Sequence, residues 1–391
     1  MHLLRAGSNS QMEMNTQMRR LQLLLVIDSL GSGGAQRQMV SLAIGLSQRG
    51  HRVELFNYYP KLNHFRSEVE SAKIEIHDLP KKGRYDLGPA FEIRKIVSSR
   101  SIDAVISFLD TPNLYSILGT IGKSQTKLLV SERSMFMDNH LDMKTLCTYQ
   151  GFRFADAITV NSFHQCDRIL RKFPWSERKL YVIWNGVDLT KYRPAAEVRT
   201  DARKPLEVLG VGTIVANKNV YNLVRALNSA REHGADVVVD WYGKLAAAGN
   251  SQGDFDRCAN LVRRCGLEKL WRWRGECSGM HEIYPKYDVL IHPSFSEGLP
   301  NAVCEGLACG LPVLASSVGD LPRLVTEGLN GWLFDPNSTE EMAEALIRAW
   351  KARTEWDAMS HASRRVAEEQ LGLDRLVDDY EETLYGICPT R

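Results

Sequence analysis

Short apolar runs alternate with amphipathic stretches along this chain, and the alternation runs through the sequence twice. The first run, at 21–27, is apolar at almost every position, as expected of a strand buried on both faces of a parallel sheet. A glycine-rich turn at 31–34 follows, then a helical pattern at 36–49 and a second strand pattern at 52–57. This order predicts a strand–helix–strand unit.

Two parallel sheets are predicted because each series contains several such units. Further strands of the first series are expected at 73–77, 104–108, 127–131, 157–160 and 181–183. Strands of the second series are expected at 206–211, 237–241, 288–292, 312–315 and 331–334. The pattern favours an α/β fold with two Rossmann-like, doubly wound domains, whose ligands bind beyond the carboxyl ends of the strands.

The chain is accordingly divided into five parts. We expect a flexible polar tail at 1–18, an N-terminal Rossmann-like domain at 19–190, a linker at 191–204, a C-terminal Rossmann-like domain at 205–370 and a last helical segment at 371–391. The linker is predicted because the sequence after Pro194 is polar and irregular.

Composition narrows the class of protein. A formal net charge of +2 over 391 residues gives no electrostatic reason to expect a nucleic-acid partner. The eight cysteines include no C-x-x-C pair, which favours reduced thiols in the cytoplasm over disulfides or a zinc site. No apolar run reaches the length of a membrane-spanning helix.

A basic and aromatic cluster at 168–179 is a candidate contact with an anionic membrane surface. Phe173 and Trp175 are surrounded there by five basic residues: Arg168, Arg171, Lys172, Arg178 and Lys179. Aromatic side chains with flanking cations are typical of peripheral membrane attachment. The alternative is a solvated helix end.

The segment 296–306 carries the strongest chemical signal. Glu297 and Glu305 stand eight positions apart, and Pro300 between them suits the first turn of a helix. Glu297 is therefore expected in a loop and Glu305 within the helix. Backbone N–H groups at a helix start attract phosphate, and carboxylates accept hydrogen bonds from sugar hydroxyls. The alternative is two solvated glutamates near a helix start.

The same segment resembles the E-x7-E motif of family-four retaining glycosyltransferases, which have the GT-B fold. Other stretches agree with that family in order and spacing: Gly33-Gly-Ala-Gln36, Asn185-Gly-Val-Asp188 with Tyr192-Arg-Pro194, Gly212 with Lys218 and Asn219, Gly310-Leu-Pro-Val313 and Gly331-Trp-Leu-Phe334. The resemblance covers about 21–350. It implies two domains facing each other across a cleft, with the acceptor on the N-terminal domain, the donor on the C-terminal domain, and the last helix returning to the N-terminal domain.

The resemblance also implies a role for each matching residue. Glu297 would contact hydroxyls of the transferred sugar and Glu305 would bind the ribose. Lys218 would lie against the diphosphate and stabilise the leaving group. The other donor-binding positions would offer backbone groups or space: Gly33, Gly34, Gly212, Thr213, Gly298 and Leu299.

Two positions depart from the family pattern. Thr213 stands where the family has an arginine, so one phosphate cation is missing or comes from elsewhere. The usual histidine of the N-terminal domain is replaced by Ser131-Glu-Arg-Ser134, as in a subgroup of the family. Arg133 is a candidate for the missing cation, and Glu132 is a candidate for shaping the acceptor site. The alternative is an Arg–Glu ion pair that supports a loop.

The resemblance predicts a retaining hexosyltransferase that uses a nucleotide sugar, most simply a UDP-linked one. Its acceptor would be a glycan or lipid-linked glycan in cell-surface polysaccharide or lipopolysaccharide synthesis, at the inner face of the plasma membrane. No metal is expected because no D-x-D pair follows a strand, and no cofactor because Gln36 replaces the third glycine of a dinucleotide fingerprint. The alternatives are a sugar-nucleotide epimerase on the same fold and a non-catalytic nucleotide-sugar-binding subunit.

Overall fold

The computed structural model of the protein describes residues 19–133, 143–195, 205–245 and 251–388. The chain forms two compact units: unit 1 joins Met1–Gly186 to Leu373–Arg391, and unit 2 is Val187–Gly372. The tail expected at 1–18 and most of the linker expected at 191–204 lie outside the described residues.

Unit 1 is built on a parallel sheet of seven strands in the order β3-β2-β1-β4-β5-β6-β7. The strands are β1 (Gln22–Ile27), β2 (Arg52–Asn57), β3 (Glu75–Asp78), β4 (Ala104–Phe108), β5 (Lys127–Glu132), β6 (Ala157–Val160) and β7 (Leu180–Val182). Side chains of β1 alternate between two cores: Leu23 and Leu25 face one, and Leu24 and Val26 face the other. This burial on both faces explains why the first strand is apolar at nearly every position.

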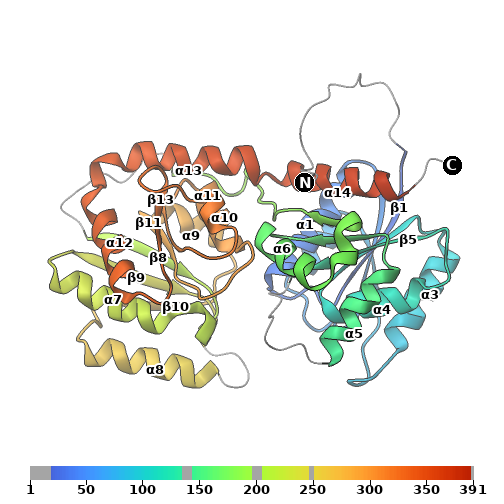
Figure 1. Ribbon diagram of the computed structural model, residues 1–391, viewed down its shortest axis with the longest axis horizontal. Helices are drawn as coiled ribbons and strands as arrows, with labels where there is room; N and C mark the ends of the chain where they lie inside the picture. Colours follow the sequence, from blue (N-terminus) through green and yellow to red (C-terminus); the bar gives the residue numbers. More distant parts are fainter. Residues whose placement is uncertain (1–18, 134–142, 196–204, 246–250, 389–391) are drawn as a thin grey trace. The chain divides into compact units, whose positions relative to one another are not determined.

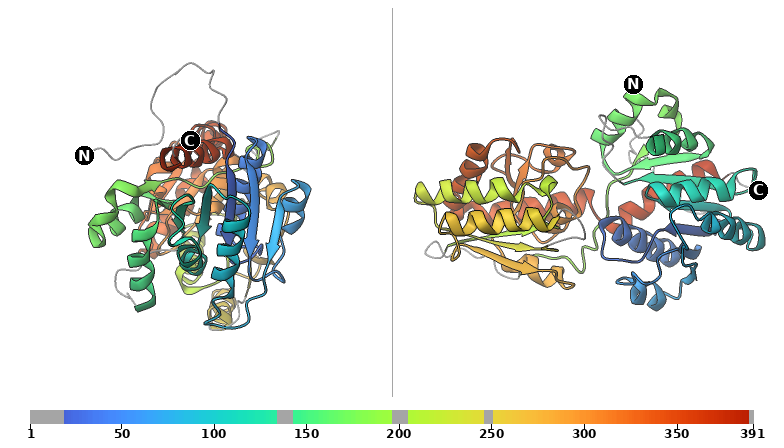
Figure 2. Two further views of the ribbon diagram at one scale, coloured as in Figure 1. Left: turned by 90° about the vertical axis from the view of Figure 1, so that its right-hand side faces the viewer. Right: turned by 90° about the horizontal axis from the view of Figure 1, so that it is seen from below.

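Two layers of helices cover the sheet of unit 1 (Figures 1 and 2). One core contains side chains of α1 (Gly34–Gln48), α2 (Arg66–Ser71) and the last helix, α14 (Leu373–Ile387). The other contains side chains of α3 (Gly88–Ser99), α4 (Asp110–Thr120), α5 (Met143–Gly151) and α6 (Phe163–Lys172). His51 Nε2 lies 2.7 Å from Glu381 Oε1, and this buried contact fastens α14 to the end of α1.

Unit 2 contains a parallel sheet of six strands in the order β10-β9-β8-β11-β12-β13. The strands are β8 (Leu206–Val211), β9 (Val237–Tyr242), β10 (Trp271–Gly275), β11 (Val289–His292), β12 (Val313–Ser316) and β13 (Gly331–Phe334). The helices are α7 (Val220–Glu232), α8 (Ser251–Arg264), α9 (Met280–Ile283), α10 (Asn301–Ala308), α11 (Leu321–Leu324), α12 (Thr339–Lys351) and α13 (Trp356–Gln370). The predicted pair of parallel, doubly wound sheets is therefore confirmed.

Strand β10 is an element that the sequence did not predict. Trp271 and Trp273 point into the core of unit 2, whereas Arg272 and Arg274 turn to the other face, where both bind the buried carboxylate of Asp240. An edge strand with this alternation lacks the continuous apolar run that marked the other strands.

Both sheets reverse their strand order at the same place. The chain moves outward from β1 in one direction and resumes at β4 on its other side, and it does the same between β8 and β11. The loops that follow these strands enclose the crevice in which doubly wound folds bind their ligands. Within the described residues, no helix combines the length and the apolar character needed to cross a bilayer.

Candidate functional site

The loop after β8 folds back so that Lys218 lies against Gly212. Gly212 has a φ of +150°, and a Cβ atom there would lie 3.2 Å from Cε of Lys218. The Gly212 carbonyl accepts a hydrogen bond from Nε1 of Trp241 at 2.8 Å, which fixes the peptide. Glycine is thus suited to this position by its backbone conformation and by the lysine chain that packs on it.

Asn219 ties this loop to its two neighbours. The residue is buried, adopts the left-handed conformation with a φ of 56°, and immediately precedes α7. Its Nδ2 donates to the carbonyls of Pro293 at 3.0 Å and Pro336 at 2.8 Å, which belong to the loops after β11 and β13. The three loops at this edge of unit 2 are therefore held in one arrangement.

Lys218 and Glu297 form an ion pair at the switch point of the sheet. Nζ of Lys218 lies 2.6 Å from Oε1 of Glu297, and the two side chains are 22% and 16% exposed. His292, at the end of β11, places its Nε2 atom 3.2 Å from the same carboxylate oxygen. The sequence had singled out Lys218 and Glu297 separately; their contact, and the part of His292 in it, are seen only in the structure.

The electrostatics of this group favour an ionised glutamate. Burial by itself raises the pKa of Glu297, but the hydrogen bond from His292 and the charge and hydrogen bond of Lys218 outweigh it, and the pKa falls well below its usual range. Burial lowers the pKa of His292, so its imidazole is neutral near pH 7. The arrangement pairs one anion with one cation where both still reach solvent.

The loop that carries Glu297 is fixed by the loop after β12. The backbone N–H of Asp320 donates to the Gly298 carbonyl at 3.2 Å, and the Leu299 side chain is buried. Gly319 has a φ of +58°, and a Cβ atom there would lie 2.2 Å from the Glu297 carbonyl oxygen. The backbone at Glu297 and Gly298 is therefore shaped before any ligand arrives.

Glu305 lies one turn inside α10, and Glu297 precedes the helix, as expected from the position of Pro300. The hydroxyl of Tyr284 donates to Oε2 of Glu305 at 2.9 Å, and the tyrosine is completely buried. A buried donor of this kind fixes the carboxylate rotamer. Tyr284 was not found from the sequence, because it precedes Glu305 by 21 positions and has no motif of its own.

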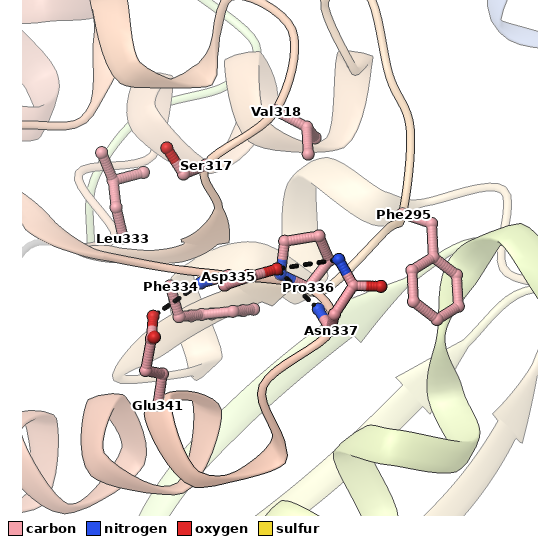
Figure 3. Close-up of a pocket in the computed structure, with 9 residues that line it drawn as sticks. All are labelled: Phe295, Ser317, Val318, Leu333, Phe334, Asp335, Pro336, Asn337 and Glu341. Atoms are coloured by element: carbon pink, nitrogen blue, oxygen red, sulfur yellow. Dashed lines mark hydrogen bonds between the residues drawn. The ribbon is translucent and has the colours of Figure 1, made fainter.

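A hollow of about 620 Å³ opens at the same edge of unit 2. Figure 3 shows Phe295, from the loop that carries Glu297, on one side of it and Asn337 and Asp335 on the other. The backbone N–H of Asp335 donates to Oε2 of Glu341 at 2.8 Å, and the backbone N–H of Glu341 donates to Oγ of Ser338, the N-cap of α12, at 3.1 Å. Lys218, Glu297 and Glu305 are not among its lining residues.

Thr213 follows Gly212 directly, and the loop after β9 runs beside it. The backbone N–H of Ile214 donates to the Lys244 carbonyl at 3.0 Å. The Lys244 side chain is exposed and lies 3.6 Å from Glu276. The Lys244 ammonium thus has a carboxylate partner of its own on the surface of unit 2.

In unit 1, Gly33 is the N-cap of α1 and Gly34 is its first residue, and both are exposed. Nearby, Nε2 of Gln36 donates to Oδ1 of Asp28 at 2.8 Å. This glycine turn stands at the switch point beside β4, which leaves its backbone accessible at the carboxyl edge of the sheet.

Arg133 follows β5 and is held by neutral partners. Its guanidinium donates to Ser131 Oγ at 2.8 Å, Asn185 Oδ1 at 2.7 Å and the Tyr380 hydroxyl at 2.6 Å. Its Cζ atom lies 4.3 Å from the ring centroid of Phe108. In the described part of the chain no carboxylate pairs with it, so the Arg–Glu ion pair considered from the sequence does not form. Ser134 lies outside the described residues.

The basic and aromatic cluster at 168–179 is not the exposed aromatic surface that its sequence suggested. Phe173 is 4% exposed and stacks on Tyr149 at 5.1 Å between ring centroids. Nζ of Lys179 donates to three carbonyls at 2.8–3.0 Å, and burial lowers its pKa. Arg171 and Lys172 remain exposed, which is the solvated helix end considered as the alternative.

Both halves of the chain match known protein families. Residues 32–191 match the family described as Glycosyltransferase Family 4, and residues 205–352 match the family described as Glycosyl transferases group 1.

Similar proteins cover most of the chain. An uncharacterized glycosyltransferase of Haemophilus influenzae is 22% identical over 92% of this chain and 98% of its own length. An N-acetylgalactosaminyltransferase of Campylobacter jejuni, named for a diphospho-undecaprenol-linked glycan, is 24% identical over 75% of this chain and 80% of its own. The structure of Anabaena HepE in complex with UDP-glucose matches with a TM-score of 0.81 at 17% identity, over 94% of this chain and all of that one.

Proposed function

Because this chain belongs to the family of group 1 glycosyltransferases, we propose that it transfers a hexosyl group from a UDP-linked sugar to a hydroxyl of a glycan or lipid-linked glycan, with retention of anomeric configuration. The donor would bind at the carboxyl edge of the sheet in unit 2. Lys218, Glu297 and Glu305 would be its principal side-chain contacts, with the backbone at Gly298 and Leu299.

The observation that carries this proposal is the Lys218–Glu297 ion pair. An ammonium and a carboxylate 2.6 Å apart, partly open to solvent at the switch point, are the two groups that a sugar diphosphate needs. The cation binds phosphate oxygens and the anion accepts hydrogen bonds from sugar hydroxyls. In the free protein the two charges neutralise each other, which lowers the cost of burying each of them in part.

The chemistry that follows is dissociation of the sugar–phosphate bond toward a negatively charged leaving group. Charge on the diphosphate grows in the transition state, and a fixed ammonium beside it stabilises that state more than the bound donor. Glu305, held by Tyr284, would retain the ribose in both states. In unit 1, Gly33 and Gly34 would allow a close approach of backbone to a ligand. Arg133 would add positive charge, since its three hydrogen bonds use only three of the five N–H groups of the guanidinium.

The acceptor proposed is a glycan on a lipid carrier in cell-surface polysaccharide synthesis at the cytoplasmic face of the membrane. The Campylobacter relative, named for a diphospho-undecaprenol-linked acceptor, supports this class. The complex of HepE with UDP-glucose supports a uridine-linked donor.

The test is a panel of nucleotide sugars, first by thermal shift and then by release of free nucleotide. A bound donor raises the melting temperature by mass action. Slow release of UDP together with free sugar from one donor would support the proposal. An isomerised donor would instead indicate an epimerase, and binding without turnover on any acceptor glycan would indicate a non-catalytic subunit.

A further inference from the structure

Exposed apolar side chains gather on one surface of unit 1, at the beginning of α3 and the end of α4. Of the eleven large hydrophobic side chains exposed in the described residues, five lie there: Tyr85, Leu87, Phe91, Leu118 and Ile121. Tyr85 is 85% exposed and Phe91 is 68% exposed, so neither ring contributes to a core. We call these five residues the α3–α4 patch. A grouped set of this kind, unlike scattered single residues, marks a surface with a partner.

The helices and the loop that carry the patch are joined by direct contacts. The two helices pack side by side (Figures 1 and 2), with Gly119 of α4 against Ala90 and Ile93 of α3. Nη1 of Arg94 donates to the Ile121 carbonyl at 2.9 Å and so joins α3 to the end of α4. The Tyr115 hydroxyl donates to the Asp86 carbonyl at 2.8 Å, which holds the loop carrying Tyr85 against α4.

Positive charge borders the patch. Lys82, Arg84 and Arg94 are exposed, and none of them forms a salt bridge with a carboxylate among the residues that the structure describes, although Asp86 of the same loop feels the charge of Lys82. Lys95, also exposed, has only a long contact of 3.4 Å with Glu92. Apolar side chains bordered by cations match a bilayer with anionic headgroups, because the rings enter the interface and the cations bind lipid phosphates.

One end of the patch, at Tyr85 and Leu87, adjoins the edge of the sheet where ligands of unit 1 would bind, whereas Leu118 and Ile121 at the end of α4 lie toward the opposite edge. The loop that carries Tyr85 begins directly after β3, and the backbone N–H of Lys81 donates to the Tyr58 carbonyl at 3.0 Å, beyond the end of β2. An acceptor anchored in a bilayer that meets Tyr85 and Leu87 would therefore lie beside the carboxyl edge of the strands.

We propose that the α3–α4 patch is the surface by which this chain binds a bilayer that contains anionic phospholipid. The proposal rests on the lipid-linked acceptor proposed above. The α3–α4 patch takes the place of the cluster at 168–179 as the candidate membrane surface, because Phe173 of that cluster packs inside the unit. A second copy of the chain is a poorer occupant, because pairing two such surfaces would bring their bordering cations together.

The test measures co-sedimentation with vesicles of phosphatidylcholine and phosphatidylglycerol at low salt, with pure phosphatidylcholine vesicles for comparison. One double variant, Lys82→Glu with Arg84→Glu, reverses charge at the patch, and another, Phe91→Glu with Leu118→Glu, removes its apolar contacts. The matched control, Arg171→Glu with Lys172→Glu, makes the same change in net charge on the exposed end of α6.

Each cation near an anionic surface contributes about fivefold to binding, so the first variant should lose at least about 25-fold. Binding of the apolar variant should also fall, while the control should stay close to wild type. Release of UDP from the donor, measured without vesicles, should be the same in all three, because none of these residues lies near Lys218 or Glu297 in the chain or belongs to unit 2.

Three results would overturn the proposal. Patch variants could bind as wild type does, or the control could lose as much as they do. Wild-type protein could also sediment as a dimer that Phe91→Glu with Leu118→Glu dissociates, which would assign the patch to a second copy. Absence of UDP release from every donor would count against the proposed function alone, since vesicle binding is measured independently of it.

Discussion

Replacing Lys218 by alanine should reduce turnover strongly while leaving the fold intact. The Lys218 side chain is 22% exposed, and its ammonium lies 2.6 Å from the Glu297 carboxylate. At about 4 Å from a phosphate oxygen and an effective dielectric constant of about 20, one such charge is worth roughly 4 kcal/mol. Part of that energy already stabilises the bound donor, so we expect a loss of about 2.7–4 kcal/mol in the transition state, or roughly 100- to 1,000-fold in kcat.

The assay is UDP release at saturating donor, with melting temperature as the check on folding. Lys244→Ala is the matched control, because Lys244 is another exposed lysine whose backbone borders the same loop and whose side chain pairs with Glu276 at 3.6 Å. Little change is expected in that variant. If folded Lys218→Ala protein kept most of its turnover, or if Lys244→Ala lost as much, the leaving-group cation would not be Lys218.

Four further predictions concern the same edge of unit 2. Glu305→Ala should raise KM for the donor with a smaller effect on kcat, whereas Glu297→Gln should mainly lower kcat; equal and purely KM effects would contradict these roles. Asn219→Ala should destabilise the unit by about 2–4 kcal/mol in a denaturant titration, because two buried carbonyls lose their donor and alanine resists a φ of 56°. Turnover should persist in excess chelator; collapse with recovery on adding manganese would refute this. The pKa of Glu297 is held below its ordinary value of 4.5, so the ionised carboxylate stabilises the folded protein above pH 4.5, and this stabilisation is lost as the pH falls through the lowered pKa. The Tm difference between wild type and Glu297→Gln should therefore shrink in acid.

The sheets were predictable because their strands are buried on both faces. Continuous apolar runs, such as the one that became β1, are visible in a single sequence without knowledge of their neighbours. Strand β10 was missed because its arginines alternate with tryptophans, and the partner that satisfies them, Asp240, is 32 and 34 positions away. Long-range pairing of this kind has no local signal.

The candidate site was predictable as a set of residues and not as a set of contacts. Glycines and glutamates at motif spacing indicated which loops to examine, but Lys218 and Glu297 are 79 positions apart, and only the order of the strands brings them together. Burial was the other missing quantity. Phe173 looked like a surface aromatic because cations flank it in sequence, whereas its ring packs against Tyr149. Phe91 was overlooked although Arg94 and Lys95 follow it closely, because its exposed ring cannot be told from a buried one in sequence.

The stereochemistry of donor cleavage tests the central claim most directly, and it needs no knowledge of the acceptor. Proton NMR can follow the slow hydrolysis of an α-linked UDP-sugar and identify the first anomer released, before the free sugar equilibrates. We expect UDP together with an α-sugar, formed by wild-type protein and lost in Lys218→Ala. A β-sugar as the first product, an isomerised donor, or no cleavage of any donor would contradict a retaining transferase with its leaving-group site at Lys218 and Glu297.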